Sequence, residues 1–402
     1  MRASFYVATL AATLFNVPAA ADDTYKTYYS QWMASSIISR GQGVMNGLGG
    51  ASEALQAGFV QKALTALSIH YPNSSAAYTP YVQKSASSTI PFLSNATYDA
   101  LSYPMDRLSN GNALLNLAPG KGASTYRATA DALRESISLN RRNAEGGLWY
   151  YVYPYWSYLD GMYSLGPFYT LYTLKAATSS GNKSTAAALN DMLFQFDILW
   201  RHTFHAATGL LTHGYDATRT AVWADPKTGA SPYVWGRSLG WYAMALVDTL
   251  EILETGRAPS SYKTPLLDKF QSLMPAVIKA VDSQTGGWWQ VVDQPGREGN
   301  YIESSGTAMF SYALLKGARL GYLPRKLAPT ARTVGTRAQK YLTSAFVVKE
   351  ANGTLSYNGT VAVCSLNSTA SYEYYVGQPI LYNSVLGSAA YVLASIEAEI
   401  LR

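Results

Sequence analysis

The stretch Glu145-Gly-Gly-Leu-Trp149 is a turn with glycine that leads into a short extended piece carrying a large residue. Three later stretches share this form, and each follows a helix-like segment: Thr208-Gly-Leu-Leu-Thr-His213, Thr285-Gly-Gly-Trp-Trp289 and Asn352-Gly-Thr-Leu-Ser-Tyr357. The turns recur every 60 to 80 residues. Such self-similarity indicates a repeat architecture, in which each unit buries its apolar face against its neighbours.

Helical periodicity recurs along the chain, whereas strand-like runs are few and short. The segments expected to be helical are 51–70, 123–140, 184–204, 237–254, 262–281, 304–320, 330–346 and 384–401. At the observed period, the roughly 380 residues after position 21 form about six helical hairpins. Six hairpins that close into a ring predict an all-α fold, an (α/α)6 barrel with its turns gathered around a cleft at one end. An open helical solenoid is the alternative.

The N-terminus is typical of a signal peptide over residues 1–21. Arg2 supplies the positive end, residues 5–17 are apolar, and residues 18–21 offer an Ala-x-Ala cleavage site. No segment of the chain has the length and apolar character of a membrane span, so we expect no membrane association. No Pro- or Gly-rich linker divides the remainder, which predicts a single catalytic domain over 22–402.

Asn-x-Ser/Thr sequons indicate a secreted glycoprotein when they accompany a signal peptide. The chain has six of them, at Asn73, Asn95, Asn182, Asn352, Asn358 and Asn367. The single cysteine, Cys364, cannot form an internal disulfide, so a large core must supply the stability. We expect a monomer.

The composition favours acidic, ring-shaped ligands. The chain carries a formal charge of +6, 32 Tyr and 9 Trp, and tyrosine combines a flat apolar body with a polar tip. No Lys/Arg cluster of the kind that binds nucleic acid is present, so nucleic acid is not an expected partner. Acidic sugars fit this balance better.

One carboxylate, Asp160, follows a run of aromatic residues over 148–158 and precedes Gly161. Sugars bind in such surroundings, because their C–H faces stack on rings while a few polar groups fix their orientation. A carboxyl group among rings also suits a general acid. The alternative is a buried helix in which Asp160 only caps a turn.

Asp106 and His213 are further candidates for chemistry. Asp106 precedes a glycine-containing turn, as Asp160 does, and paired acids could hydrolyse glycosides; a helix N-cap is the alternative. His213 lies in the extended piece of a repeated turn, where cleft residues should gather. His202 and His205 stand three positions apart, a spacing that could suggest a metal site, but no cysteine or His-Glu-x-x-His pattern supports one. We expect neither a metal nor a cofactor.

Arg237 opens a helix between Trp235 and Trp241. A guanidinium at a helix N-terminus is a natural receptor for a carboxylate, because its two-pronged fork and the helix dipole act together. The alternative is an arginine that packs on tryptophan for structural reasons. Ser-His-Asp catalysis is poorly supported, and the chain has neither a phosphate loop nor a dinucleotide fingerprint, nor the alternating strands that would carry them.

At these motifs the chain resembles glycoside hydrolase family 105, the unsaturated rhamnogalacturonyl hydrolases, and the resemblance covers nearly the whole mature chain. Its pieces are Gly146–Trp149, Leu159–Tyr163, His213–Asp216, Ala224–Pro232, Trp235–Asp248, Gln290–Tyr301 and Glu303–Gly306. The resemblance implies an (α/α)6 barrel, in agreement with the repeat. It places the catalytic acid at Asp160, a second acid at Asp106 and a cleft histidine at His213. The substrate contacts that we expect are Arg237, Trp235, Trp241, Trp149 and Tyr163.

The resemblance also implies a substrate with a C4=C5 double bond, an unsaturated uronic-acid oligosaccharide left by a pectin lyase. Protonation of C4 makes C5 electrophilic, water adds there, and the resulting hemiketal opens and expels the neighbouring sugar. No nucleophile is needed, so one carboxyl can act as acid and then as base. The family carries a basic residue after Gly-Gly-x-Trp where this chain has Tyr150-Tyr151, so one substrate contact is missing or replaced.

Three other functions remain to be weighed. An unsaturated glucuronyl hydrolase of family 88 shares the chemistry but takes other uronides. An α-mannanase on this barrel would show adjacent aspartates in its site. The pair Asp22-Asp23 lies instead at the N-terminus expected after cleavage of the signal peptide. A non-catalytic sugar-binding protein would keep the cleft, but the intact Asp160, Asp106 and His213 argue against it.

Overall fold

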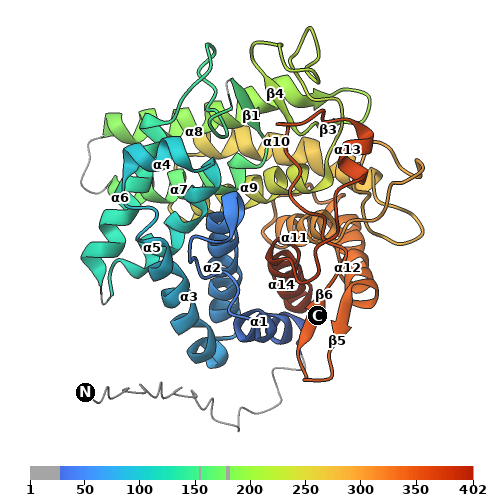
Figure 1. Ribbon diagram of the computed structural model, residues 1–402, viewed down its shortest axis with the longest axis horizontal. Helices are drawn as coiled ribbons and strands as arrows, with labels where there is room; N and C mark the ends of the chain where they lie inside the picture. The colour runs from blue at the N-terminus through green and yellow to red at the C-terminus, as the bar shows by residue number, and fades with distance from the viewer. Residues whose placement is uncertain (1–27, 121, 154, 178–181, 402) are drawn as a thin grey trace, which may run out of the picture.

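The computed structural model describes residues 28–120, 122–153, 155–177 and 182–401 (Figure 1). The predicted signal peptide, residues 1–21, lies outside the described residues. The longer helices are α1 (Tyr29–Ser39), α2 (Glu53–His70), α3 (Ser75–Thr89), α6 (Ala123–Leu139), α7 (Gly161–Ala176), α8 (Asn182–Thr203), α9 (Gly236–Thr255), α10 (Ser260–Lys279), α11 (Ser304–Arg319), α12 (Ala328–Ala345) and α14 (Val385–Ile400). The shorter ones are η2 (Gly50–Ser52), η3 (Pro72–Ser74), α4 (Ala96–Ser102), η4 (Met105–Asn110), α5 (Gly111–Leu117) and α13 (Tyr372–Val376).

The helices form a closed double ring. Within the described chain, the inner ring runs through α2, η4 with α5, α7, α9, α11 and α14, each packed on the next, and α14 packs back on α2. Each inner element also packs on an outer helix: α2 on α3, α5 on α6, α7 on α8, α9 on α10, α11 on α12, and α14 on α1. The predicted (α/α)6 barrel is therefore confirmed, and the open solenoid is wrong because the first and last inner helices meet.

The repeated turns have one backbone conformation in common. Their first glycines, Gly146, Gly209, Gly286 and Gly353, all have φ between 74° and 89°. Residues with a Cβ rarely adopt this left-handed region, which explains why glycine stands at the same place in each turn. Each turn links the end of an outer helix to the start of the next inner helix, so all four gather where the inner helices begin.

Short antiparallel pairs of strands stiffen this end. β1 (Trp156–Tyr158) pairs with β4 (Gly214–Asp216), β2 (Phe204–His205) with β3 (Leu210–Leu211), and β5 (Val347–Lys349) with β6 (Leu355–Tyr357). Isolated bridges add Leu148 to Arg142 and Trp289 to Ile302. The extended pieces expected after the glycine turns are thus present, and they connect neighbouring hairpins at the end of the barrel.

Periodicity found the amphipathic helices and missed others. Polar outer helices such as α6 and α12 bury one face only, which makes their period visible in sequence. The inner helix α7 was missed because it contains Gly166 and Pro167, which are unfavourable inside a helix; α9, α11 and α14 are buried as completely and were predicted. The outer helix α1 was also missed. The outer helix α3, rich in serine and interrupted by Pro80, was missed as well. Among the described residues, no helix is both long and apolar enough to cross a membrane.

Candidate active site

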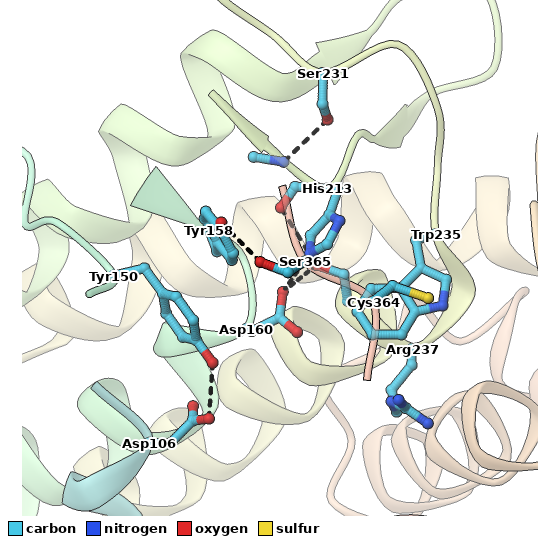
Figure 2. Close-up of polar contacts among 12 residues, drawn as sticks. Asp106, Tyr150, Tyr158, Asp160, His213, Ser231, Trp235, Arg237, Cys364 and Ser365 are labelled. Atoms are coloured by element: carbon cyan, nitrogen blue, oxygen red, sulfur yellow. Dashed lines mark hydrogen bonds and ion pairs between the residues drawn. The ribbon is translucent and has the colours of Figure 1, made fainter. Parts of the chain in front are cut away.

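Asp160 directly precedes α7 at the end of the barrel where the inner helices begin (Figure 2). Its side chain is buried, with 8% of the residue exposed. Carboxylate Oδ2 accepts a hydrogen bond from the hydroxyl of Ser238, in the first turn of α9. The side chain makes no cap hydrogen bond to α7. The contacts of Asp160 therefore run across the ring to the next inner helix, as expected of a site residue rather than of a helix cap.

Strand pairing brings His213 to Asp160. Because β1 pairs with β4, the residues at the ends of these strands meet, and the Leu159 amide donates to the His213 carbonyl at 3.0 Å. Imidazole Nε2 then lies 3.3 Å from Asp160 Oδ2. On the other side of the ring, Nδ1 lies 2.8 Å from the hydroxyl of Tyr375, in α13. Tyr375 therefore orients the imidazole, and Nε2 faces the carboxylate.

The surroundings of His213 exclude water. The residue is fully buried, and its ring centroid lies 4.8 Å from that of Trp235 and 5.2 Å from that of Tyr158. Nε2 approaches Asp160 closely, but the atoms are not aligned as a hydrogen bond, and Nε2 has no hydrogen-bond partner among the described residues. A buried imidazole nitrogen without a partner is costly.

Asp106 occupies the first turn of η4 and contacts Tyr150, the first of the two tyrosines that follow Trp149. The Tyr150 hydroxyl donates to Asp106 Oδ2 at 2.7 Å, and the Tyr150 ring stacks on Tyr158 with centroids 4.4 Å apart (Figure 2). Pro104, not Asp106, occupies the cap position of η4. Tyr150 therefore takes up a hydrogen bond of Asp106, and the capping alternative for Asp106 has no support.

The pKa of Asp106 is raised to about 7 in the folded protein. Burial is the largest cause and the nearby Asp160 acts in the same direction, while the Tyr150 hydrogen bond and the charge of Arg107 lower the pKa. Burial disfavours the ionised form because the charge loses its water. Near neutral pH, Asp106 can therefore hold or release a proton.

Arg237 is fully buried, and both terminal nitrogens of its guanidinium bind groups of the protein. Nη1 donates to the carbonyl of Val361 at 2.6 Å, and Nη2 donates to the carbonyl of Ala362 at 2.7 Å. The guanidinium carbon lies 4.8 Å from the Trp235 ring centroid, and the group points away from Asp160 (Figure 2). Arg237 thus ties the segment after β6 to the start of α9. Its predicted grip on a substrate carboxylate stays a prediction.

The expected aromatic contacts fall into two groups. Trp235 lies at His213 and donates from its ring nitrogen to Gln290 Oε1 at 3.1 Å. Trp241 and Tyr163 lie deeper in the barrel, packed on each other with centroids 4.4 Å apart. Trp149 lies on the β1 side, and the guanidinium carbon of Arg141 lies 5.4 Å from the Trp149 ring centroid. The structure therefore brings Trp235 together with Asp160 and His213, whereas Trp241 and Tyr163 belong to the core below them.

Sequence reasoning missed the partners that hold the acidic and imidazole groups. Ser238 lies in the motif Trp235–Asp248 and Tyr150 directly follows Gly146–Trp149, but neither was assigned a role, and Tyr375 lies outside the motifs found in the sequence. The only available signal was their place beside a candidate, as Ser238 stands beside Arg237. Their function depends on contacts across the ring, which sequence spacing does not encode.

The contacts of His202 and His205 do not support a metal site at these residues. His202 contacts the Thr228 carbonyl and Glu145, and His205 contacts the Thr208 hydroxyl, so both serve local turns. Among the residues that the structure describes, no group of three or more His, Cys, Asp and Glu is arranged to hold a metal ion.

Carboxylates stand at the starts of two inner helices, because Asp160 precedes α7 and Glu303 caps α11. The inner helices α7, α9 and α11 all begin here, and each N-terminus carries partial positive charge. Asp160, His213 and Asp106 add groups that can donate and accept protons, enclosed by aromatic rings. The arrangement can protonate a bound sugar acid and activate water.

Comparison with known proteins agrees with this chemistry. The sequence model of Glycosyl Hydrolase Family 88 matches residues 55–401. The structure of the C. acetobutylicum ATCC 824 glycoside hydrolase from family 105 is 31% identical, with a TM-score of 0.79, over 93% of this chain and 99% of that chain. The 24.9 kDa protein of the picA locus of Rhizobium radiobacter is 36% identical over 219 residues, 53% of this chain and 91% of that protein.

The fold recurs at lower identity. The unsaturated glucuronyl hydrolase of Bacillus sp. GL1 is 12% identical, with a TM-score of 0.59, over 86% of each chain. The family match spans most of the chain, and it confirms the resemblance drawn from the motifs. The chain belongs to the glycoside hydrolases of families 88 and 105.

Proposed function

We propose that the chain is secreted and removes the unsaturated galacturonyl residue from the products that lyases release from rhamnogalacturonan and pectin. The observation that carries the proposal is the buried Asp160, held by Ser238 and faced by the free nitrogen of His213. The identity with the family 105 hydrolase of C. acetobutylicum supports this substrate class over the uronides of more distant relatives.

The proposed reaction is a hydration. Asp160 donates a proton to C4 of the double bond, and positive charge develops at C5 and the ring oxygen. Water adds at C5 and returns a proton to the Asp160 carboxylate, so the acid is regenerated. The hemiketal then opens and releases the neighbouring sugar. His213 lies close enough to Asp160 to stabilise its ionised form between the two steps.

Recognition of the uronate draws on the start of α9. The substrate carboxylate lies next to C5, so a cation near Asp160 would also fix the distance to C4. Arg237 is the candidate, and the N-termini of the inner helices add to its charge. Two of its nitrogens already bind backbone carbonyls, so the substrate would be bound by the donors that remain. Trp235 is the candidate ring for the sugar face.

The test compares two substrates that differ in the uronyl group and its neighbour. Unsaturated galacturonyl-rhamnose should lose its enol-ether absorbance with the purified protein, and an unsaturated glucuronyl disaccharide should lose it far more slowly. A preference for the glucuronyl substrate would favour the activity of the unsaturated glucuronyl hydrolase from Bacillus sp. GL1. Binding of either sugar without loss of absorbance would identify a sugar-binding protein.

Secretion is proposed from the predicted signal peptide and the sequons. Five sequon asparagines are exposed in the described chain: Asn73, Asn95, Asn352, Asn358 and Asn367. Exposure is what a glycan requires. Expression of the full chain in a eukaryotic secretory host should yield a cleaved, glycosylated protein in the medium. Deletion of residues 1–21 should retain an unglycosylated protein in the cells.

A further inference from the structure

A closed network of four buried residues lies on the side of the His213 imidazole that faces away from Asp160. His213 Nδ1 lies 2.8 Å from the Tyr375 hydroxyl. The backbone carbonyl of Tyr375 accepts from Gln290 Nε2 at 3.0 Å, and Gln290 Oε1 accepts from the ring nitrogen of Trp235 at 3.1 Å. The Trp235 ring packs on the imidazole, with centroids 4.8 Å apart. Each member of the network is therefore held by two others.

The donors and acceptors of this network have fixed directions. The indole nitrogen of Trp235 can only donate, so the oxygen of the Gln290 amide faces it and the amide nitrogen faces Tyr375. All four residues of the network are at most 1% exposed, so water cannot replace a lost partner. The network therefore holds the Tyr375 hydroxyl in one place against the imidazole.

The Tyr375 hydroxyl has one way to satisfy its hydrogen. Among the described residues, His213 Nδ1 is the only hydrogen-bond partner of that oxygen. Burial raises the pKa of Tyr375 well above its usual value, so the phenol keeps its proton. If Tyr375 accepted from an Nδ1–H group instead, its own hydrogen would be buried without an acceptor, which is costly. Donation from Tyr375 to the lone pair of Nδ1 is therefore favoured.

The Asp160 side of the imidazole favours the same arrangement. In a neutral imidazole one nitrogen carries the hydrogen, and the hydrogen bond made by the other nitrogen decides which. With Nδ1 as the acceptor, the hydrogen is on Nε2, which lies 3.3 Å from Asp160 Oδ2. An ionised carboxylate attracts an N–H group at this distance and repels a lone pair. Both neighbours of His213 therefore select the Nε2–H tautomer.

We propose that Tyr375 is a positioning residue, which keeps the hydrogen of His213 on Nε2 and so directs it at Asp160. The inference rests on the proposed hydration, in which Asp160 is ionised after it has given its proton to C4. The Nε2–H group then stabilises the carboxylate without itself transferring a proton. Tyr375 acts through His213 and not on the substrate, and Gln290 holds the backbone of Tyr375 in the position that this requires.

The first measurement identifies the tautomer in the full chain. The imidazole nitrogens are isotope-labelled, and NMR correlation with the ring C–H groups distinguishes bare from hydrogen-bearing nitrogens. The chain has four histidines, so glutamine substitution of His70, His202 and His205 in turn identifies the His213 signals. At about pH 8, where histidine is ordinarily neutral, the wild type should show Nε2–H. A hydrogen on Nδ1, alone or together with one on Nε2, would overturn the proposal.

The second measurement compares matched variants at adjacent positions of α13. Tyr375→Phe removes the hydroxyl that faces Nδ1, so the two tautomers should mix. The value of kcat should fall by about tenfold, the equivalent of one hydrogen bond, with KM nearly unchanged. Tyr374→Phe makes the same change one residue earlier, where the hydroxyl accepts from the Ser365 amide at 2.8 Å. This control should keep both the tautomer and kcat.

The outcomes separate this inference from the proposed function. The inference is overturned if a folded Tyr375→Phe keeps the Nε2–H tautomer or the wild-type kcat, or if Tyr374→Phe changes both to the same extent. Melting temperatures report on folding, and if Tyr375→Phe does not fold, the wild-type spectrum alone decides. Absence of turnover in the wild type with either uronyl substrate would overturn the proposed function and leave the tautomer readable.

Discussion

His213 Nε2 lies 3.3 Å from Asp160 Oδ2, although 53 residues separate the two in the chain. The approach is set by the backbone, because the β1–β4 pair and the Leu159–His213 hydrogen bond fix both peptide segments. A carboxylate and an imidazole at this distance can exchange a proton, and each can stabilise the charge of the other. The following predictions depend on this geometry and on the groups around it.

Replacement of Asp160 by asparagine should abolish turnover and leave the protein folded. Asparagine keeps the shape and can still accept from Ser238, but it has no proton to give to C4. Loss of a general acid costs about 10²–10⁴-fold, and the double role of Asp160 should place the loss at the upper end. Turnover of unsaturated galacturonyl-rhamnose and the melting temperature should be measured together. A variant within about tenfold of the wild type would move the acid role to Asp106.

Tyr150→Phe should shift the pH dependence of activity. The Tyr150 hydrogen bond lowers the pKa of Asp106 against the effect of burial. Without the hydroxyl, the pKa of Asp106 should rise further, so the limb of the rate profile that follows Asp106 ionisation should move up by as much as about one pH unit. Tyr151→Phe is the matched control, because the Tyr151 hydroxyl binds the Ser102 carbonyl instead. Equal shifts in both variants would show that Tyr150 does not act through Asp106.

Arg237→Lys should not be conservative. Lysine lacks the two-pronged fork and the flat face that packs on Trp235. The melting temperature should fall, because the carbonyls of Val361 and Ala362 lose their donors. If Arg237 also binds the uronate, the maximal rate should fall and the apparent substrate constant should rise. Their ratio, kcat/KM, should then fall by about 10²-fold. Normal kinetics of the folded fraction with a lowered melting temperature would leave Arg237 a purely structural role.

Asp106 should make the protein less stable as the pH rises. The pKa of Asp106 is raised from 3.8 to about 7 on folding, so between these values the folded state binds more protons than the unfolded state. The stabilising contribution is complete below about pH 4 and is lost as the pH rises through 7. Asp106→Asn should remove this dependence, which is a few kcal/mol at most.

Urea unfolding of the wild type and Asp106→Asn at pH 5 and pH 8 measures this effect. Asp99, whose pKa burial raises to about 6, contributes in the same direction to both proteins. The difference between the two proteins therefore isolates Asp106. An identical pH dependence in both would show that Asp106 is ionised in the folded protein throughout this range.

Chelation should leave activity unchanged. The described residues contain no cluster of His, Cys, Asp and Glu that could hold a metal ion, and the proposed hydration needs only proton transfer. Prolonged dialysis against a chelator, followed by assay with and without added divalent ions, tests this expectation. Activity that is lost and then restored by one ion alone would contradict it.

The repeated glycine turns and the aromatic run over residues 148–158 could be recognised in the sequence because both depend on local chemistry. Glycine at Gly146, Gly209, Gly286 and Gly353 is required by the backbone of each turn, and amphipathic outer helices reveal themselves through their polar faces. These two signals were enough to predict the (α/α)6 barrel. The aromatic residues before Asp160 likewise pointed to the end of the barrel where the inner helices begin, since a sugar site needs rings and a carboxylate together.

Tertiary structure alone decided what each candidate contacts. Closure of the ring brings Ser238 and His213 to Asp160, and a loop contact gives Asp106 the Tyr150 hydroxyl. It also turns Arg237 toward backbone carbonyls. These contacts join residues tens to more than a hundred positions apart, and their geometry follows from packing between hairpins. Sequence periodicity describes each hairpin separately, so it could name the chemical groups but not their partners.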